Sequence, residues 1–353
     1  GWPNSTQAEI DAFPRRIVYM KEQVYSFCSN FVKTSKYEWY NFAPKFLMES
    51  FNLKTKIANT YFLVIAALQT VGPISNTNGV PTTLFPLTLV LLFDGIFAAL
   101  EDRNRHVADK EANSSLTTVW NGETNQWESR TWSDLCVGQF VQLKTREPVP
   151  ADMVIISGHE KNAVISGQCY VETKSLDGET NLKLRQAMPN TMSRVREGAD
   201  LNSLSGTIEM EHPNKRIDDF TGSYKVTHLG TEHQEPVNSS NVLLRGCVLR
   251  NTEWVIGIVI NTGKDTKIMM SSTETIGKYS FLESAATKEI VRVFLLLFFL
   301  AFVGATGMAI WNEENDPKNL PYLQWSYEAG SEWFVQFFYI LLLHATFCPV
   351  SLY

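Results

Sequence analysis

The sequence lacks the closely spaced cysteines of a metal motif or of a disulfide-rich domain. Its 353 residues include five cysteines, and these lie far apart in the chain. They are Cys28, Cys136, Cys169, Cys247 and Cys348. We therefore expect reduced, buried or incidental thiols, and we expect no bound metal.

Basic blocks and phosphate-binding loops are also missing. The formal net charge is −6 and the lysines and arginines form no block, so nothing indicates a nucleic acid partner. No glycine-rich phosphate loop is present, so we expect no nucleotide site within this stretch. The chain begins at Gly1 without a charged-then-apolar leader, which suggests a segment of a longer protein already in its membrane context.

Apolar residues are concentrated near both ends of the chain. The mean hydropathy of −0.12 averages a polar middle with strongly apolar flanks. Four apolar runs are present, namely Ile57–Ile74, Leu84–Leu100, Ile290–Ile310 and a run that begins at Trp333. Because about 20 residues of helix cross a bilayer, these runs are candidates for membrane-spanning helices. Lysines and arginines ahead of the first run predict a cytosolic N-terminus.

The pattern predicts a membrane protein with α-helical spans and a mostly β cytosolic domain. Short alternating runs such as Val255–Ile260, separated by turn residues, favour many short strands in the middle of the chain. Residues 188–235 have weak periodicity and many charges, so we expect surface helices or loops there. The predicted division is an N-terminal cytosolic region (1–56), spans one and two (57–100), the β domain with its linkers (101–289), span three (290–311), an outer loop (312–332) and the start of span four (333–353).

Several polar or helix-breaking residues lie in or beside the spans. Asp94 is either functional or protonated or paired against a neighbouring helix, because a charge is costly in this position. Gln69 and Thr70 lie at the outer end of the first span, where they either meet a lipid headgroup or simply end the helix. Pro349 unwinds or kinks the last span, which makes either a cavity lining or a packing kink.

An acidic turn follows a short β-type run in the stretch Cys169–Lys183. Within it, Gly178 permits a positive φ, so the backbone can reverse and leave Glu179 at the tip of a loop. The turn is either an ordinary solvated hairpin or a carboxylate that is carried to another surface. The residues of the turn alone leave both interpretations open.

Several motifs in the same order resemble the first part of a type IV P-type ATPase, a lipid flippase. They are Asn41–Leu47, Glu101–His106, Ala108–Glu111, Val171–Lys183, Leu243–Trp254, Thr262–Met269 and Pro349–Leu352. The resemblance implies that the β domain is the actuator domain of such a pump. It also implies that Asp177, Gly178, Glu179 and Thr180 form its dephosphorylation loop, with Glu179 activating the water that hydrolyses an aspartyl phosphate.

The same resemblance implies a lipid path beside the first, second and fourth spans. Gln69 and Thr70 would lie near the headgroup entry, and Pro349, Val350, Ser351 and Leu352 would form an unwound segment with Val350 as an apolar gate. The implied partners are a phospholipid substrate, the membrane and a two-span glycosylated accessory subunit. The implied location is the plasma membrane or Golgi and endosomal membranes. ATP and Mg²⁺ would bind the complete protein outside this stretch.

Two departures from the family pattern bear on the functional prediction. Phe97-Ala98 replaces a Lys-Glu pair that the family usually has in the second span, and no phosphorylatable aspartate of the family's type precedes Tyr353. The resemblance therefore predicts part of an ATP-driven phospholipid translocase that is inactive by itself. The alternative is a flippase-like regulatory or scaffold module that does not transport, for example one fused to a guanylate cyclase.

Overall fold

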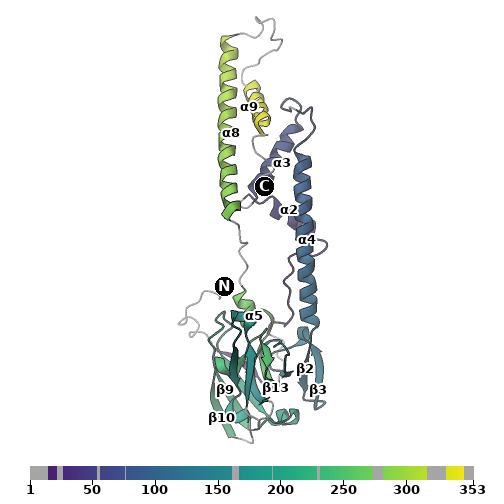
Figure 1. The fold of residues 1–353 in the computed structure, drawn as a ribbon, viewed down its shortest axis with the longest axis vertical. Helices are drawn as coiled ribbons and strands as arrows, with labels where there is room; N and C mark the ends of the chain where they lie inside the picture. The colour runs from purple at the N-terminus through teal and green to yellow at the C-terminus, as the bar shows by residue number, and fades with distance from the viewer. Residues whose placement is uncertain are drawn as a thin grey trace. The chain divides into compact units, whose positions relative to one another are not determined.

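A computed structural model describes most of the chain as two compact units. The described residues are 15–21, 27–53, 56–75, 77–160, 167–192, 194–228, 231–272, 281–315 and 331–345. One unit, here the β unit, comprises residues up to Thr34 together with Arg105–Thr275. The other, the helical unit, comprises Ser35–Asn104 and Ile276–Tyr353. Figure 1 shows the ribbon of each unit.

The β unit is built from three antiparallel sheets. Their strand orders are β1-β8-β9-β10, β11-β5-β13-β4-β2-β3 and β12-β6-β7. The strands are β1 (Arg16–Tyr19), β2 (Leu116–Asn121), β3 (Gln126–Thr131), β4 (Phe140–Lys144), β5 (Asp152–Glu160), β6 (Gln168–Glu172), β7 (Leu182–Gln186), β8 (Ser205–Met210), β9 (Thr221–His228), β10 (Thr231–Asn238), β11 (Val242–Leu243), β12 (Val248–Arg250) and β13 (Thr252–Asn261).

Short helical turns connect these strands. They are η1 (Trp132–Asp134), α5 (Lys174–Asp177), α6 (Pro189–Met192), η2 (Gly198–Ser203), η3 (Ser239–Asn241), η4 (Gly263–Asp265) and α7 (Lys267–Ser271). The predicted mostly β domain is thus confirmed.

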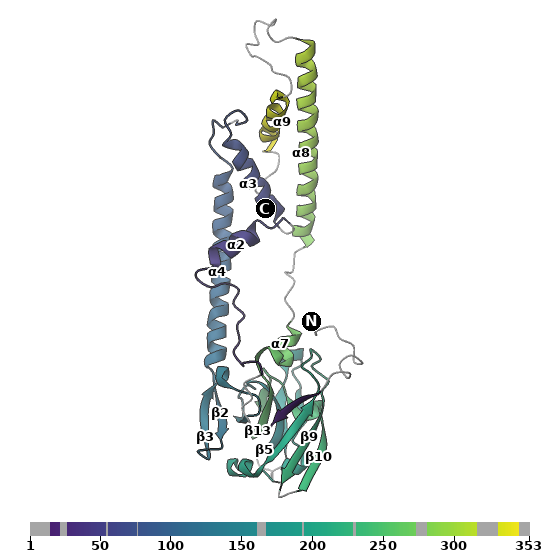
Figure 2. The same ribbon diagram turned by 180° about the vertical axis from the view of Figure 1, so that it is seen from behind.

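The core of the β unit lies around the paired strands β5 and β13. Residues 152–158 and 255–261 are buried without interruption, because both faces of this sheet are covered. Figure 2 shows β5 and β13 among the strands of the unit, with β9 and β10 in the neighbouring sheet. Long apolar runs in these strands therefore reflect burial on both faces.

The prediction of surface helices or loops for residues 188–235 is wrong in part. Helical turns α6 and η2 lie there, but strands β8 and β9 and the first part of β10 do as well, and β8 pairs with β9 in a continuous antiparallel register. Only alternate residues such as Tyr224 and Val226 are large and buried, whereas Gly222 and Ser223 supply no apolar signal. The weak hydropathy alternation of β9 concealed the strand.

An N-terminal strand completes the first sheet. Strand β1 pairs with β8, from Arg16 opposite Met210 to Tyr19 opposite Thr207. Val18 and Met20 point into the core, with exposures of 0% and 6%. Described residues ahead of the first apolar run, up to Thr34, therefore belong structurally to the β unit.

The helical unit contains two long and three shorter helices among the described residues. They are α2 (Phe42–Ser50), α3 (Ile57–Gln69), α4 (Leu84–Ser114, which continues from Arg105 onward as part of the β unit), α8 (Phe281–Glu314) and α9 (Ser331–His344). Helix α4 and residues 287–314 of α8 are long and apolar enough to cross a membrane, whereas α3 and α9 are shorter apolar helices. The first predicted span thus begins at Ile57 as expected but ends at Gln69, ahead of Gly72 and Pro73.

Close contacts join the described helices of this unit. The rings of Tyr61 on α3 and Phe294 on α8 stack with centroids 3.9 Å apart. Helices α8 and α9 lie side by side in both views (Figures 1 and 2), and a Cβ at Gly304 would meet Ile340 at 3.1 Å. A small residue at such a contact lets two helices approach closely.

Asp94 has a partner within the helical unit. The Nζ atom of Lys56, just before α3, lies 2.7 Å from Oδ2 of Asp94 on α4. Of the readings left open by the sequence, the structure therefore shows an ion pair with a neighbouring segment.

Candidate functional site

The acidic turn joins two paired strands in the β unit. Strands β6 and β7 are antiparallel, with Glu172 opposite Leu182, and α5 forms a single helical turn at the start of the connection. Gly178 ends α5 in the left-handed conformation, with φ of 77° and ψ of 0°. A side chain is disfavoured in that conformation, so glycine is the residue that allows the chain to reverse here.

Asp177 organises the turn. Its carboxylate accepts hydrogen bonds from the Thr173 hydroxyl at 3.0 and 2.9 Å, from the Glu179 amide at 2.9 Å and from Lys183 Nζ at 2.6 Å. The Lys183 hydrogen bond, aided by those from Glu179 and Thr173, lowers the pKa of Asp177 to about 2. Asp177 is therefore ionised at physiological pH, and its donors hold it in place.

Glu179 is exposed to solvent, whereas Asp177 is held by hydrogen bonds. The Glu179 side chain is 59% exposed, against 21% for Asp177. Its carboxylate forms an ion pair of 3.3 Å with Lys183 Nζ. Gly178 and Thr180, on either side of it, are exposed as well. The turn thus presents one accessible carboxylate that can accept a proton from an approaching water molecule.

The sheet beneath the turn gives it a rigid support. The Ser175 hydroxyl donates to the carbonyl of Gly246 at 2.6 Å, which ties α5 to the loop between β11 and β12. Arg250 on β12 pairs with Glu172 on β6 at 2.7 Å. A carboxylate mounted on strands is held more accurately than one on a long loop.

Lys183 is the residue of this site to which the sequence analysis gave no role. It contacts both Asp177 and Glu179, at 2.6 and 3.3 Å. The sequence feature that could have indicated this contact is the four-residue spacing of Glu179 and Lys183. That spacing usually indicates an ion pair only within a helix. Here a β-hairpin brings the two side chains together.

The predicted headgroup residues at the end of α3 are occupied within the helical unit. Gln69 is 5% exposed. Its Oε1 accepts from the amide and the hydroxyl of Thr83 at 3.2 and 3.0 Å, and its Nε2 donates to the Thr82 hydroxyl at 3.2 Å. The Thr70 hydroxyl donates to the carbonyl of Ala67 at 2.7 Å. In this structure the Thr70 side chain therefore hydrogen-bonds to the end of α3, and the Gln69 side chain links α3 to the hairpin that follows.

The remaining predicted lipid-path residues lie outside the described residues. They are Pro349, Val350, Ser351 and Leu352.

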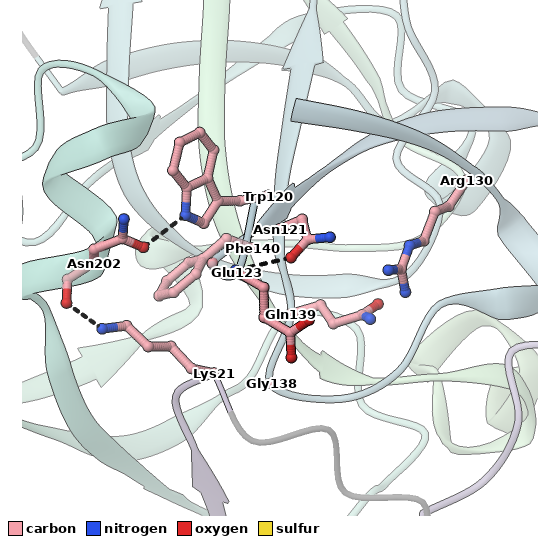
Figure 3. Close-up of a pocket in the computed structure, with 10 residues that line it drawn as sticks. Lys21, Trp120, Asn121, Glu123, Arg130, Gly138, Gln139, Phe140 and Asn202 are labelled. Atoms are coloured by element: carbon pink, nitrogen blue, oxygen red, sulfur yellow. Dashed lines mark hydrogen bonds between the residues drawn. The ribbon is translucent and has the colours of Figure 1, made fainter. Parts of the chain in front are cut away.

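A separate hollow of about 240 Å³ lies in the β unit (Figure 3). Lys21 donates to the Asn202 carbonyl at 2.5 Å, and the Trp120 indole donates to the Asn202 side chain at 3.0 Å. Lys21 and Arg130 bring positive charge to the lining, and Glu123 brings a carboxylate. These opposing charges indicate no single class of ligand, and no sequence motif marks the hollow.

A buried polar network secures the N-terminal segment within the β unit. The Asn30 amide donates to the carbonyls of Trp132 and Pro150 at 2.7 and 3.3 Å. Its oxygen accepts from the Arg245 guanidinium and from the Gly263 amide, both at 3.0 Å. One side chain therefore connects four separate segments of the unit.

Asp152 and Lys267 continue this network. Asp152 accepts from the backbone amides of Arg245 and Lys267, each at 2.9 Å, while burial raises its pKa to about 6. The Lys267 ammonium lies 3.3 Å from Glu211 and donates to the carbonyl of Asp219 at 2.6 Å. No group of three or more His, Cys, Asp or Glu that could hold a metal occurs among the described residues.

A β unit with a braced acidic hairpin, joined in one chain to long apolar helices, defines the actuator and membrane parts of a P-type ATPase. Residues 15–83 match the protein family described as phospholipid-translocating ATPase N-terminal. The chain belongs to the type IV P-type ATPases, the phospholipid-transporting family.

Similar proteins come from animals, fungi and plants. Phospholipid-transporting ATPase ID of Mus musculus is 37% identical over 333 residues, which are 93% of this chain and 26% of that protein. Phospholipid-transporting ATPase DRS2 of Saccharomyces cerevisiae is 32% identical over 356 residues, 99% of this chain and 25% of that protein. Phospholipid-transporting ATPase 1 of Arabidopsis thaliana is 31% identical, over 99% of this chain and 30% of that protein. The chain thus spans about a quarter of the length of these relatives.

Proposed function

We propose that the full-length protein is an ATP-driven phospholipid translocase, which moves lipid from the outer or lumenal leaflet to the cytosolic leaflet. The observation that supports it best is the accessible Glu179 carboxylate, mounted on a turn that Asp177 braces. ATP and Mg²⁺ would bind outside this chain. The names of the similar proteins support the same activity.

In the proposed reaction, Glu179 acts on an aspartyl phosphate that lies outside this chain. Glu179 takes a proton from a water molecule as the water oxygen bonds to phosphorus. The bond between phosphorus and the aspartyl oxygen then breaks, and the products are inorganic phosphate and a free aspartate carboxylate. A positioned general base of this kind contributes about 10²–10⁴-fold to a rate.

Movement of the β unit during the phosphate cycle would drive the attached helices. Gln69 and Thr70 would take part in headgroup entry only after Gln69 releases Thr82 and Thr83, because its amide is occupied by them. Pro349, Val350, Ser351 and Leu352 would form the gate of the path. The protein would reside in the plasma membrane or in Golgi and endosomal membranes, with its β unit on the cytosolic side. A two-span accessory subunit would join the complex.

The test uses the full-length protein. Incubation with radiolabelled ATP should give a phosphoenzyme that hydroxylamine removes, because an aspartyl phosphate is an acyl phosphate. Glu179→Gln should accumulate this phosphoenzyme and abolish the uptake of fluorescent phospholipid. Absence of any phosphoenzyme in the parent protein would instead favour the non-transporting regulatory module.

A further inference from the structure

Lys183 occupies the centre of the acidic turn. It lies on β7 opposite the buried Val171, and its ammonium is 2.6 Å from Asp177 Oδ2 and 3.3 Å from Glu179 Oε2. The hydrogen bond to Asp177 is the main cause that raises the pKa of Lys183, so the lysine keeps its charge at any pH at which the protein works. A permanent positive charge is thus fixed between the two carboxylates.

The two contacts of Lys183 differ in strength. Asp177 is also held by Thr173 and by the Glu179 amide, and it makes the shorter contact with Lys183. The Glu179 carboxylate is more exposed and its contact is longer. Exposed ion pairs contribute little to stability, so Glu179 can leave Lys183 without disturbing the anchor.

Charge gives this arrangement a consequence for phosphate chemistry. Asp177 and Glu179 carry two negative charges, and an aspartyl phosphate is itself an anion. A turn with two carboxylates and no cation would be repelled as it approached such a group. Lys183 offsets one of these charges at a distance of a few ångströms from both carboxylates.

We propose that Lys183 is a positioning residue for dephosphorylation: it holds Glu179 between reaction cycles and reduces the repulsion between the acidic turn and the phosphate. This inference rests on the proposed function. Lys183 keeps its proton throughout, because Glu179 receives the proton of the attacking water. When Glu179 turns toward that water, Lys183 stays bound to Asp177.

The test follows the decay of the phosphoenzyme in the full-length protein after a chase with unlabelled ATP. Lys183→Gln should slow the decay by about fivefold or more, the scale of one weakly screened charge pair. Lys183→Arg should retain most of the parent rate, because a guanidinium can also contact two carboxylates. Lys174→Gln is the matched control, since Lys174 is an exposed lysine of the same turn with no ion pair among the described residues.

Ionic strength separates a role in charge from a merely structural one. Added salt should accelerate Lys183→Gln relative to the parent, because salt screens the repulsion that the lysine otherwise offsets. Decay that is equally slow in Lys183→Gln and Lys183→Arg, with the parent's salt dependence, would show a structural role and overturn the inference.

Glu179→Gln separates failure of this inference from failure of the proposed function. If Glu179→Gln arrests decay while Lys183→Gln decays at the parent rate, the role of Lys183 is wrong and the proposed function stands. If Glu179→Gln decays at the parent rate, the role proposed for Glu179 is wrong and the inference falls with it.

Discussion

The acidic turn of the β unit and the hairpin between α3 and α4 use their polar side chains in opposite ways. Glu179, on the turn, has a mostly exposed carboxylate that forms an ion pair of 3.3 Å with Lys183. Gln69, the last residue of α3, is 5% exposed and its amide contacts both Thr82 and Thr83 in the hairpin that leads to α4. The turn has a second acid, Asp177, which accepts the hydrogen bonds that hold the turn together. The Glu179 carboxylate is therefore left accessible to solvent. The hairpin has no such substitute for Gln69 in the described structure, so Gln69 itself holds the segment together.

The largest expected effect separates the two side chains by their chemistry. Glu179→Gln should slow decay of the phosphoenzyme by about 100-fold or more, because an amide cannot act as the general base. Gln69→Ala should slow this decay much less, because the Gln69 amide hydrogen-bonds to Thr82 and Thr83 and is not a proton acceptor for the reacting water. Both variants are measured by chase of the labelled full-length protein, and equal decay rates in the two would abolish the distinction.

Asp152, which is buried more deeply than Gln69, should make the stability of the fold depend on pH. Burial raises the pKa of Asp152 to about 6 from its ordinary 3.8, so the folded protein binds this proton more tightly than the unfolded chain does. The free energy of unfolding gained by protonating Asp152 is fully present below about pH 4 and is lost as the pH rises through about 6.

The loss in the free energy of unfolding should reach about 3 kcal/mol, which corresponds to roughly two pKa units. Thermal unfolding across this pH range measures the loss. Asp152→Asn should flatten the pH dependence and lower stability at every pH, because one of the two backbone amides that donate to Asp152 would then meet the NH₂ group of asparagine. A pH dependence of equal size in Asp152→Asn would assign the effect to another group.

Loss of the Gln69 amide should weaken the hairpin between α3 and α4. Gln69→Ala leaves the amide and hydroxyl of Thr83 without their present acceptor, at a cost of about 1–3 kcal/mol. Thermal inactivation of the full-length protein reports this loss. Thr88→Val is a suitable control, because the Thr88 hydroxyl donates to the Leu84 carbonyl within its own helix. Equal effects of the two variants would mean that the hairpin contacts add nothing.

The smallest expected effect concerns the backbone of the acidic turn. Gly178 has φ of 77° and no heavy atom within 4 Å of a Cβ built on it, so Gly178→Ala should cost only the conformational penalty of about 1 kcal/mol. Gly122→Ala, at an ordinary φ with its nearest neighbour at 3.6 Å, is the matched control. Slower phosphoenzyme decay in Gly178→Ala but not in Gly122→Ala would show that the shape of the turn matters to the reaction.

Local patterns in the sequence predicted the elements whose partners are close in the chain. The apolar runs beginning at Ile57 and Leu84 became α3 and α4, and the run Val255–Ile260 lies in β13. Asp-Gly in a short polar stretch correctly indicated a reversal at Gly178. In these cases side-chain hydropathy or a single backbone preference is sufficient.

Long-range contacts could not be predicted in the same way. Pairing of β1 with β8 joins Arg16 to Met210, and nothing in either segment specifies the other. Likewise, the occupation of Gln69 by Thr82 and Thr83 depends on how the chain returns after the first helix. The roles of Glu179 and Gln69 came from resemblance to a family, and they remain predictions.

Asn30 has a consequence for how the protein could be shortened. Its side chain meets the hydrogen-bonding needs of Trp132, Pro150, Arg245 and Gly263 simultaneously. A truncation that begins after Asn30 would remove strand β1 and also leave a guanidinium and a backbone amide buried without their acceptor. The amino-terminal segment is therefore an integral part of the folding unit, although Asn30 lies 233 positions from Gly263, the farthest of these partners.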